Sequence, residues 1–157
     1  MHRQPIALSL VLLCVMLFSA CAALRGETPR QQLRTHRQLW DEQKITEYRY
    51  TFKVGCLCPP EVVAPVIAHV RDGQPVSLTY RESSDAVNST FLANYDTMDK
   101  LFGVIESAIN SRAYMIRVTY DPELGYPAKI SIDYEKRAVD DEISWTISDV
   151  EVLQKGP

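Results

Sequence analysis

The chain has 157 residues, of which 46% are hydrophobic and 24% charged, a balance that fits one globular domain and excludes a disordered, collagen-like or polytopic membrane chain. Seventeen Lys and Arg against twenty Asp and Glu give a formal net charge of -3, so no broad basic field is present for binding nucleic acid. Three histidines and four cysteines are too few for a zinc-finger or cysteine-rich scaffold.

The chain opens with the pattern of an export signal. Arg3 carries the one fixed side-chain charge at the start, and residues 5–18 then run without a charge through mostly large apolar side chains. Ser19-Ala20 and Cys21 follow, an arrangement that resembles the lipobox at which bacterial signal peptidase II cuts before a lipid-modified cysteine. This interpretation divides the chain into a signal peptide (1–20), a lipid-anchored linker that begins at Cys21 (21–28) and a single α+β domain (29–157).

Two other interpretations of this segment stay open. Residues 6–24 are uncharged, and as a helix they span about 28 Å, enough for an uncut anchor across a bilayer. Ala20-Cys21-Ala22 also fits the small-x-small pattern of ordinary signal peptidase, which releases a soluble product. All three place the domain outside the cytoplasm. We expect an exported protein that Cys21 anchors by lipid on the periplasmic or extracellular side of a membrane.

The first helix is predicted to begin after Thr28, which can cap it, with Pro29 in the first turn and Gln31 completing a capping box. It should run to about Lys44, and Trp40 is its expected contact with the sheet. Basic residues follow the anchor along this segment, where they either contact anionic headgroups or form a solvated helix face. They are Arg25, Arg30, Arg34 and Arg37.

Three strands should follow this helix. Residues 48–54 alternate apolar and polar side chains without error, which indicates a half-buried strand. Strand character resumes over residues 66–70, and Asp72-Gly73 supplies a tight hairpin turn to a returning strand over residues 76–80. We expect residues 81–95 to form a polar surface loop.

Asp96-Thr97 can cap a second helix, whose apolar residues recur at helical spacing over residues 98–109. Strands are predicted over residues 114–120 and 128–134. The last strand starts at Ile143, and its apolar phase switches near Ser148-Asp149, which predicts a β-bulge. The residues expected to point inward from the first two of these strands are Tyr114, Ile116, Val118, Tyr120, Ala128, Ile130, Ile132 and Tyr134.

The order helix, three strands, helix, three strands predicts an α+β fold. Short connections favour antiparallel pairing, and clean alternation indicates a sheet that is covered on one face only. We therefore expect an antiparallel sheet of about six strands with two helices on one face. About ten buried apolar side chains at about 1.5 to 3 kcal/mol each suffice for such a core, so no metal or other cofactor is needed to hold it.

A set of short motifs between about Leu39 and Asp149 occurs in a recognisable order. It consists of Trp40, Tyr48-x-Tyr50, Cys56-x-Cys58-Pro59, Asp72-Gly73, Leu101-Phe102, Tyr120-Asp121-Pro122, Leu124-Gly125-Tyr126-Pro127, Ile132-x-x and Asp140-Asp141-Glu142. The set resembles domain of unknown function 6174, a bacterial family whose members look like exported, often lipid-anchored proteins. The resemblance implies a fold and a location, and it brings no reaction, substrate or cofactor.

Cys56 and Cys58 are the sharpest chemical feature, because in an oxidising compartment they are available to each other. A straight strand would hold their Cα atoms about 6.6 to 6.8 Å apart, at the upper limit for a disulfide, so a turn is needed to close the ring. A static disulfide that shapes the loop is the simplest interpretation. A redox couple and a soft-metal site are alternatives, although no helix start or cation that lowers a thiol pKa is predicted there.

Carboxylates form a second cluster, which suits a hard cation such as calcium. Its candidate residues are Asp133, Asp140, Asp141 and Glu142. The spacing matches no calcium loop, and turn chemistry ahead of a strand explains Asp140-Asp141 more simply, so no metal site is assigned.

No Ser-His-Asp set and no glycine-rich phosphate loop is identifiable, and His69 is expected to be an exposed sheet residue. We therefore expect no enzyme but a noncatalytic module, tethered to the membrane by lipid, that binds an envelope protein or peptide. A thiol redox module using Cys56 and Cys58 and a calcium-binding envelope protein are the alternatives. The binding surface is expected on the polar sheet face, with Arg49, Thr51, Lys53, Ser131 and Asp133.

Overall fold

The computed structural model describes residues 26–138 and 141–157. Cys21 and Asp140 lie outside the described residues. None of the described helices has the length and apolar character needed to cross a membrane. The elements in chain order are α2 (Pro29–Glu42), β1 (Ile45–Gly55), α3 (Pro60–Val63), β2 (Val66–Arg71), β3 (Gln74–Tyr80), η1 (Leu92–Tyr95), α4 (Met98–Asn110), β4 (Met115–Tyr120), β5 (Pro127–Asp133) and β6 (Ile143–Lys155).

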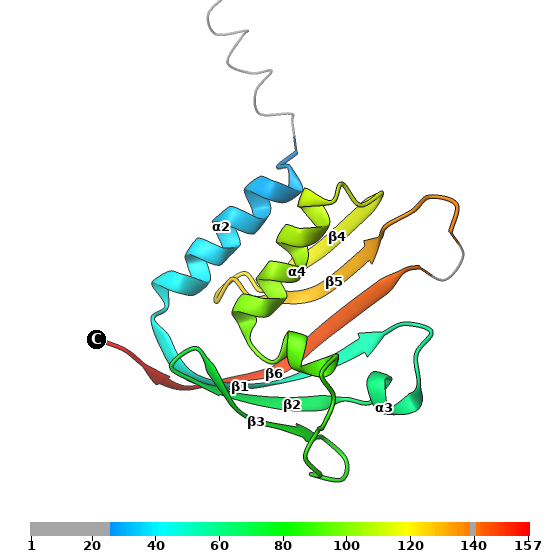
Figure 1. Ribbon diagram of the computed structural model, residues 1–157. Helices are drawn as coiled ribbons and strands as arrows, with labels where there is room; N and C mark the ends of the chain where they lie inside the picture. The colour runs from blue at the N-terminus through cyan, green and yellow to red at the C-terminus, as the bar shows by residue number, and fades with distance from the viewer. Residues whose placement is uncertain (1–25, 139–140) are drawn as a thin grey trace, which may run out of the picture.

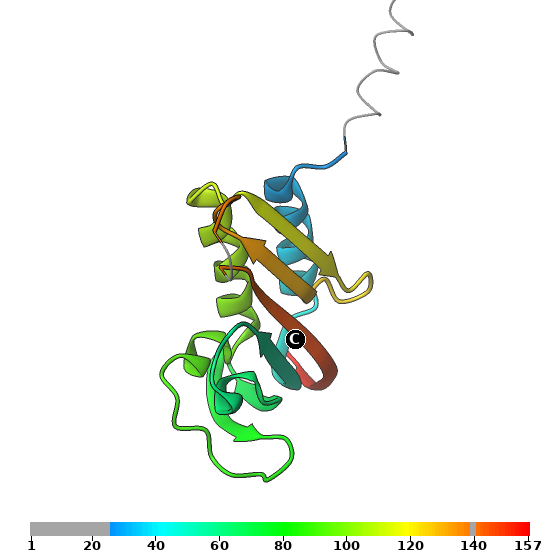
Figure 2. The ribbon, with the colours of Figure 1, turned by 90° about the vertical axis from the view of Figure 1, so that its right-hand side faces the viewer.

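The six strands form one antiparallel sheet in the order β3-β2-β1-β6-β5-β4. The two long helices, α2 and α4, lie side by side on one face of this sheet (Figure 1). The view turned by 90° shows the twist of the sheet between β3 and β4 (Figure 2). The predicted α+β fold, with about six antiparallel strands and two helices on one face, is confirmed.

The predicted capping box starts α2. The Thr28 side chain accepts the backbone N–H of Gln31, and the Gln31 side chain accepts the backbone N–H of Thr28. At the other end of the helix, Trp40 is buried, and its ring meets those of Tyr48 and Tyr126 edge-on. Trp40 therefore fixes α2 to the sheet, as expected from the sequence.

The core follows the alternation of β1, whose inward residues Tyr48, Tyr50, Phe52 and Val54 are buried. Two tyrosine hydroxyls fasten the start of α4 to this strand. The Tyr48 hydroxyl accepts the backbone N–H of Met98 at 3.0 Å, and the Tyr50 hydroxyl donates to the carbonyl of Tyr95 at 2.6 Å. Burial raises the pKa of Tyr48 to about 12, so this hydroxyl stays protonated throughout the physiological range.

The predicted bulge is present in β6. Thr51 of β1 pairs with Ser148 whereas Arg49 pairs with Glu151, and Asp149 between them has φ of 51°. The bulge accommodates the extra residue, so Val152 still faces inward, where it pairs with the buried Tyr48. The bulge thus keeps both halves of a 13-residue strand facing the core in the correct phase.

Two left-handed turns shape the ends of the hairpins. Asp72 and Gly73, at φ of 50° and 72°, join β2 to β3 as predicted. Gly125, at φ of 84°, lies between β4 and β5 against α2, and a Cβ atom there would lie 2.5 Å from the carbonyl oxygen of His36. A glycine is needed at this close approach of turn and helix.

Two details of the predicted burial are wrong. Tyr114 and Tyr134 were expected to point inward, but they are 53% and 42% exposed. They lie just outside the ends of β4 and β5. The surface loop predicted over residues 81–95 is also only partly correct, because its last residues form η1, which buries Leu92 and Tyr95.

Candidate functional site

The sheet face opposite the helices, here called the outer face, is polar. Arg49, Thr51 and Lys53 of β1 point to it, since their neighbours in the strand are buried in the core. The register places Ser148 and Glu151 of β6 beside them. The outer face is thus built from alternate residues of adjacent strands.

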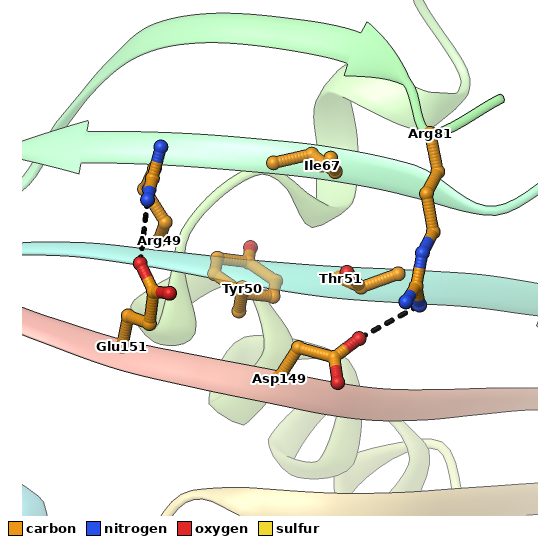
Figure 3. A pocket seen from close by; sticks show the side chains of 7 residues that line it. All are labelled: Arg49, Tyr50, Thr51, Ile67, Arg81, Asp149 and Glu151. Carbon is orange, nitrogen blue, oxygen red and sulfur yellow. Dashed lines mark hydrogen bonds and ion pairs between the residues drawn. The ribbon is translucent and has the colours of Figure 1, made fainter. Parts of the chain in front are cut away.

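A hollow of about 220 Å3 lies in this face. Figure 3 shows its lining side chains, with the ring of Tyr50 behind the sheet on the core side. The lining residues come from β1, β2 and β6 and from the residue that follows β3, and they are Arg49, Tyr50, Thr51, Ile67, Arg81, Asp149 and Glu151. Four separate segments of the sequence therefore converge at one point of the sheet.

An ion pair between Arg81 and Asp149 bounds one end of the hollow. The Arg81 guanidinium donates to the Asp149 carboxylate at 2.7 Å, from the end of β3 to β6, and so extends past β2 and β1 (Figure 3). The left-handed conformation at the bulge aims Asp149 at this face, and the Ser148 hydroxyl also donates to its carboxylate. The bulge that corrects the phase of β6 thus also supplies one wall of the hollow.

A second ion pair bounds the other end, where Arg49 of β1 donates to Glu151 of β6 at 2.6 Å. Thr51 and Ile67 lie between the two pairs. Thr51 is only 6% exposed although it points away from the helices, and Figure 3 shows the Arg81 guanidinium beside it. The hollow therefore combines a weakly polar floor with a basic and an acidic group at each end.

A third charged group extends the outer face beyond Arg49. The Oε1 atom of Glu47 accepts hydrogen bonds from Arg71 at 2.7 Å and lies 2.8 Å from Nε2 of His69. Two hydrogen bonds lower the pKa of Glu47 to about 2; the one from Arg71 has the larger effect and the one from His69 the next largest. His69 lies in a strand as expected, but it is half-buried and paired with this carboxylate, so the exposure expected for it is wrong.

Three larger hollows lie elsewhere in the described part of the chain. One, of about 240 Å3, adjoins Pro65 and Tyr80 and has two charged residues of the same sign in its lining, Glu61 and Glu82. Another, of about 410 Å3, adjoins the Cys56 loop, and the third, of about 530 Å3, lies between β3 and residues 86–91; these two have one charged residue each, Glu142 and Glu61 respectively. The outer-face hollow has four, arranged as two pairs, and convergent polar groups are what distinguish a binding site.

The sulfur atoms of Cys56 and Cys58 lie at the distance of a disulfide bond, just beyond the end of β1, and the two Cα atoms are 5.3 Å apart. A turn therefore closes the ring, as expected. The loop holds Leu57 outward, 84% exposed. The sequence did not predict α3, which begins two residues after Cys58, but this helix has only four residues and no side-chain cap. The redox and soft-metal alternatives stay predictions.

Two of the described cation candidates, Asp141 and Glu142, have separate partners. Asp141 accepts the backbone N–H of Glu135 at 2.7 Å, and Glu142 accepts the Ser131 hydroxyl at 2.9 Å. Among residues 26–138 and 141–157, no three His, Cys, Asp or Glu side chains lie close enough together to hold a metal ion. Asp133 is half-buried, and its Oδ1 atom has no hydrogen-bond partner in the described part of the chain.

The structure brings together only part of the polar surface expected from the sequence. Arg49 and Thr51 line the hollow, and Lys53 lies next to them on β1. Ser131 and Asp133 belong to β5, beyond β6, and do not line it. Sequence reasoning missed Arg81, Ile67, Asp149 and Glu151. The predicted bulge was a usable signal for Asp149, whereas nothing local in the sequence marks Arg81.

Comparison with known proteins gives one match. The model of the Family of unknown function (DUF6174) matches residues 32–152, a range that holds every residue lining the hollow. No curated protein and no solved structure matches the chain significantly.

Proposed function

Since the chain belongs to DUF6174, a family of unknown function, we propose its role from the site itself: it is a noncatalytic binding module of the cell envelope. Its outer face binds a protein or peptide through the hollow between the two ion pairs. The partner presents an aliphatic side chain to Thr51 and Ile67, flanked by one acidic and one basic group that meet the charges at the ends.

The observation that carries this proposal is the size of the hollow together with its paired charges. About 220 Å3 lies below the about 300–1,000 Å3 that is usual for small-molecule sites. It suits one side chain of a larger partner better than a whole small ligand. The charged groups are already paired with each other, which favours a partner that carries both signs over a simple ion.

A charge exchange tests the surface. Arg49→Glu combined with Glu151→Arg keeps an ion pair at two exposed strand positions that face each other but reverses its direction. Crosslinking in the native envelope should capture a discrete partner with the unaltered chain and lose it with the exchanged chain, while thermal unfolding of the two proteins agrees. Equal capture of the partner by both chains would contradict binding at the outer face.

The location is the second part of the proposal: the chain is exported and held at the membrane by a lipid on Cys21. The support is the charged start, the apolar run and the Ser19-Ala20-Cys21 sequence. Cys21→Ser should move the protein to the soluble fraction or block its processing. Unchanged size and membrane association would instead favour an uncut helical anchor.

A further inference from the structure

Three arginines form a stripe along α2. Arg30, Arg34 and Arg37 follow one another at intervals of four and three residues, which puts them on one side of a helix. With Leu33 and with Glu106 of α4 they line a groove of about 220 Å3 between the two helices. The arginine stripe belongs to the helix layer, so it lies on the opposite face of the sheet from the hollow (Figure 1).

The groove fixes two of these arginines and leaves the third available. Arg30 donates to the side-chain carbonyl of Asn110 at 2.8 Å, and Arg37 pairs with Glu106 at 3.1 Å. Arg34, between them, is exposed and has no hydrogen-bond or ion-pair partner among the described residues. The guanidinium group of Arg34 is thus available to a ligand at the centre of the groove.

Helix stability does not explain this placement. The first turn of α2 holds Arg30 and no acidic residue, and the last turn holds Asp41 and Glu42 and no basic residue. The helix dipole favours the reverse order of charges. A functional requirement for basic residues at the start of α2 would account for an arrangement that the helix itself disfavours.

The helix layer as a whole is basic at one end and acidic at the other. The start of α2 meets the end of α4 through the Arg30–Asn110 hydrogen bond, so the two helices are antiparallel. At the far end, burial and the nearby carboxylate of Asp99 raise the pKa of Asp41. An anionic surface is therefore attracted to the Arg30 end and repelled by the Asp41 end.

The basic end is also the end at which the chain enters the fold. Seven residue steps separate Cys21 from Thr28 and span at most about 25 Å when fully extended. We propose that the arginine stripe docks on the phosphate groups of anionic phospholipids, which turns the helix layer toward the membrane and the outer face away from it. This inference rests on the lipid anchor of the proposed function.

The chemistry of the groove suits this surface. A guanidinium group binds phosphate through two parallel hydrogen bonds, and the arginine stems and Leu33 offer apolar contact beside it. One arginine near an anionic membrane strengthens binding by about fivefold. Because the anchor already holds the chain at the surface, a gain of this size is enough to set its orientation.

Depth-dependent fluorescence quenching tests the docking. The full, processed chain is reconstituted in vesicles of phosphatidylcholine, alone or with phosphatidylglycerol, that carry a lipid-borne nitroxide. A fluorophore is attached at Gln38→Cys on α2 or, as a control, at Thr119→Cys on the outer face, since both positions are exposed. With Cys21 acylated and Cys56 bonded to Cys58, the introduced thiol is the reactive one.

We expect the α2 label to be quenched more strongly in the anionic vesicles, and the outer-face label to be quenched in neither. Arg34→Glu should lower the ratio of docked to undocked protein by about fivefold or more. Arg117→Glu, an equal charge change at an exposed position of β4, should leave it unchanged. High salt should reduce the difference between the vesicles.

Equal quenching in both vesicles, quenching of the outer-face label instead, or no effect of Arg34→Glu would each overturn the docking. Treating the chain that has no introduced cysteine with the thiol reagent distinguishes failure of the lipid anchor from failure of the docking. A thiol-reactive Cys21 contradicts the anchor, and the docking falls with it. A blocked Cys21 with an unquenched α2 label contradicts the docking alone.

Discussion

The carboxylate of Asp149 accepts a hydrogen bond from the Arg81 guanidinium at 2.7 Å, although 68 residues and two strands separate them. Both side chains are about half exposed, at 52% for Arg81 and 54% for Asp149. Pairs this accessible contribute about 0–1 kcal/mol to stability. The pair is better explained by the shape and charge that it gives to the outer face.

The first prediction separates these two roles. Asp149→Asn and Arg81→Gln should each lower the free energy of unfolding by less than about 1 kcal/mol, because each removes only an exposed ion pair. Urea unfolding measures this, with Arg49→Gln as the matched change at the other end of the hollow. Capture of the partner should fall in all three variants. A stability loss above about 2 kcal/mol would make the pair structural.

The bulge gives a second prediction. Deletion of Asp149 would remove the extra residue, so that Val150 alone stands opposite Tyr50 while Glu151 stays outward and Val152 inward. We expect this variant to fold with the native register but to lose the ion pair with Arg81. Asp149→Gly keeps the residue count and suits the left-handed backbone, so it should retain the native circular dichroism spectrum. A deletion variant that does not fold would mean that the bulged backbone itself is needed for the fold.

Gly125→Ala should be strongly destabilising. The left-handed backbone costs about 1–2 kcal/mol, and overpacking against the helix costs about 1–3 kcal/mol more. Gly73→Ala is the control, because its φ is also positive but no atom lies within 4 Å of the added Cβ. It should lose only the backbone contribution. Thermal or urea unfolding measures the loss of stability. Equal losses in the two variants would show that α2 accommodates the added Cβ atom at residue 125 without a loss of stability.

Glu47 makes stability depend on pH in the acid range. Its pKa is about 2 in the folded protein and near the ordinary 4.5 when unfolded, so folding favours the ionised form. The contribution is complete above about pH 4.5 and is lost as the pH falls toward 2. Glu47→Gln should flatten the unfolding free energy measured across this window. An unchanged slope would mean that Arg71 and His69 do not hold the carboxylate in solution.

The sequence predicts the parts of this fold that depend on local chemistry. The alternation of residues 48–54, the Thr28 capping box and the phase switch at Asp149 each specify an element that the structure contains. These signals are local because backbone hydrogen bonding and side-chain direction repeat over a few residues. They place Arg49 and Thr51 on the correct face.

The rest depends on contacts that no short segment contains. The sequence predicts Arg81 to be a loop residue. It reaches Asp149 because the strands are arranged in the order β3-β2-β1-β6. Tyr114 fits the alternation of its strand but lies just before β4 begins and is 53% exposed. Strand order and the extent of the covering layer are properties of the whole fold, and strand alternation alone does not encode them.

Site-specific photo-crosslinking in intact cells tests the central claim most directly. A photoreactive residue at Thr146, which is exposed on β6 and pairs with Lys53 and Lys129, probes the outer face, and one at Ser107, exposed on α4, probes the helix layer. We predict a discrete protein adduct from position 146 that disappears in the Arg49→Glu, Glu151→Arg background, and none from position 107. A protein adduct from position 107 alone, or one from position 146 that survives the charge exchange, would contradict the claim.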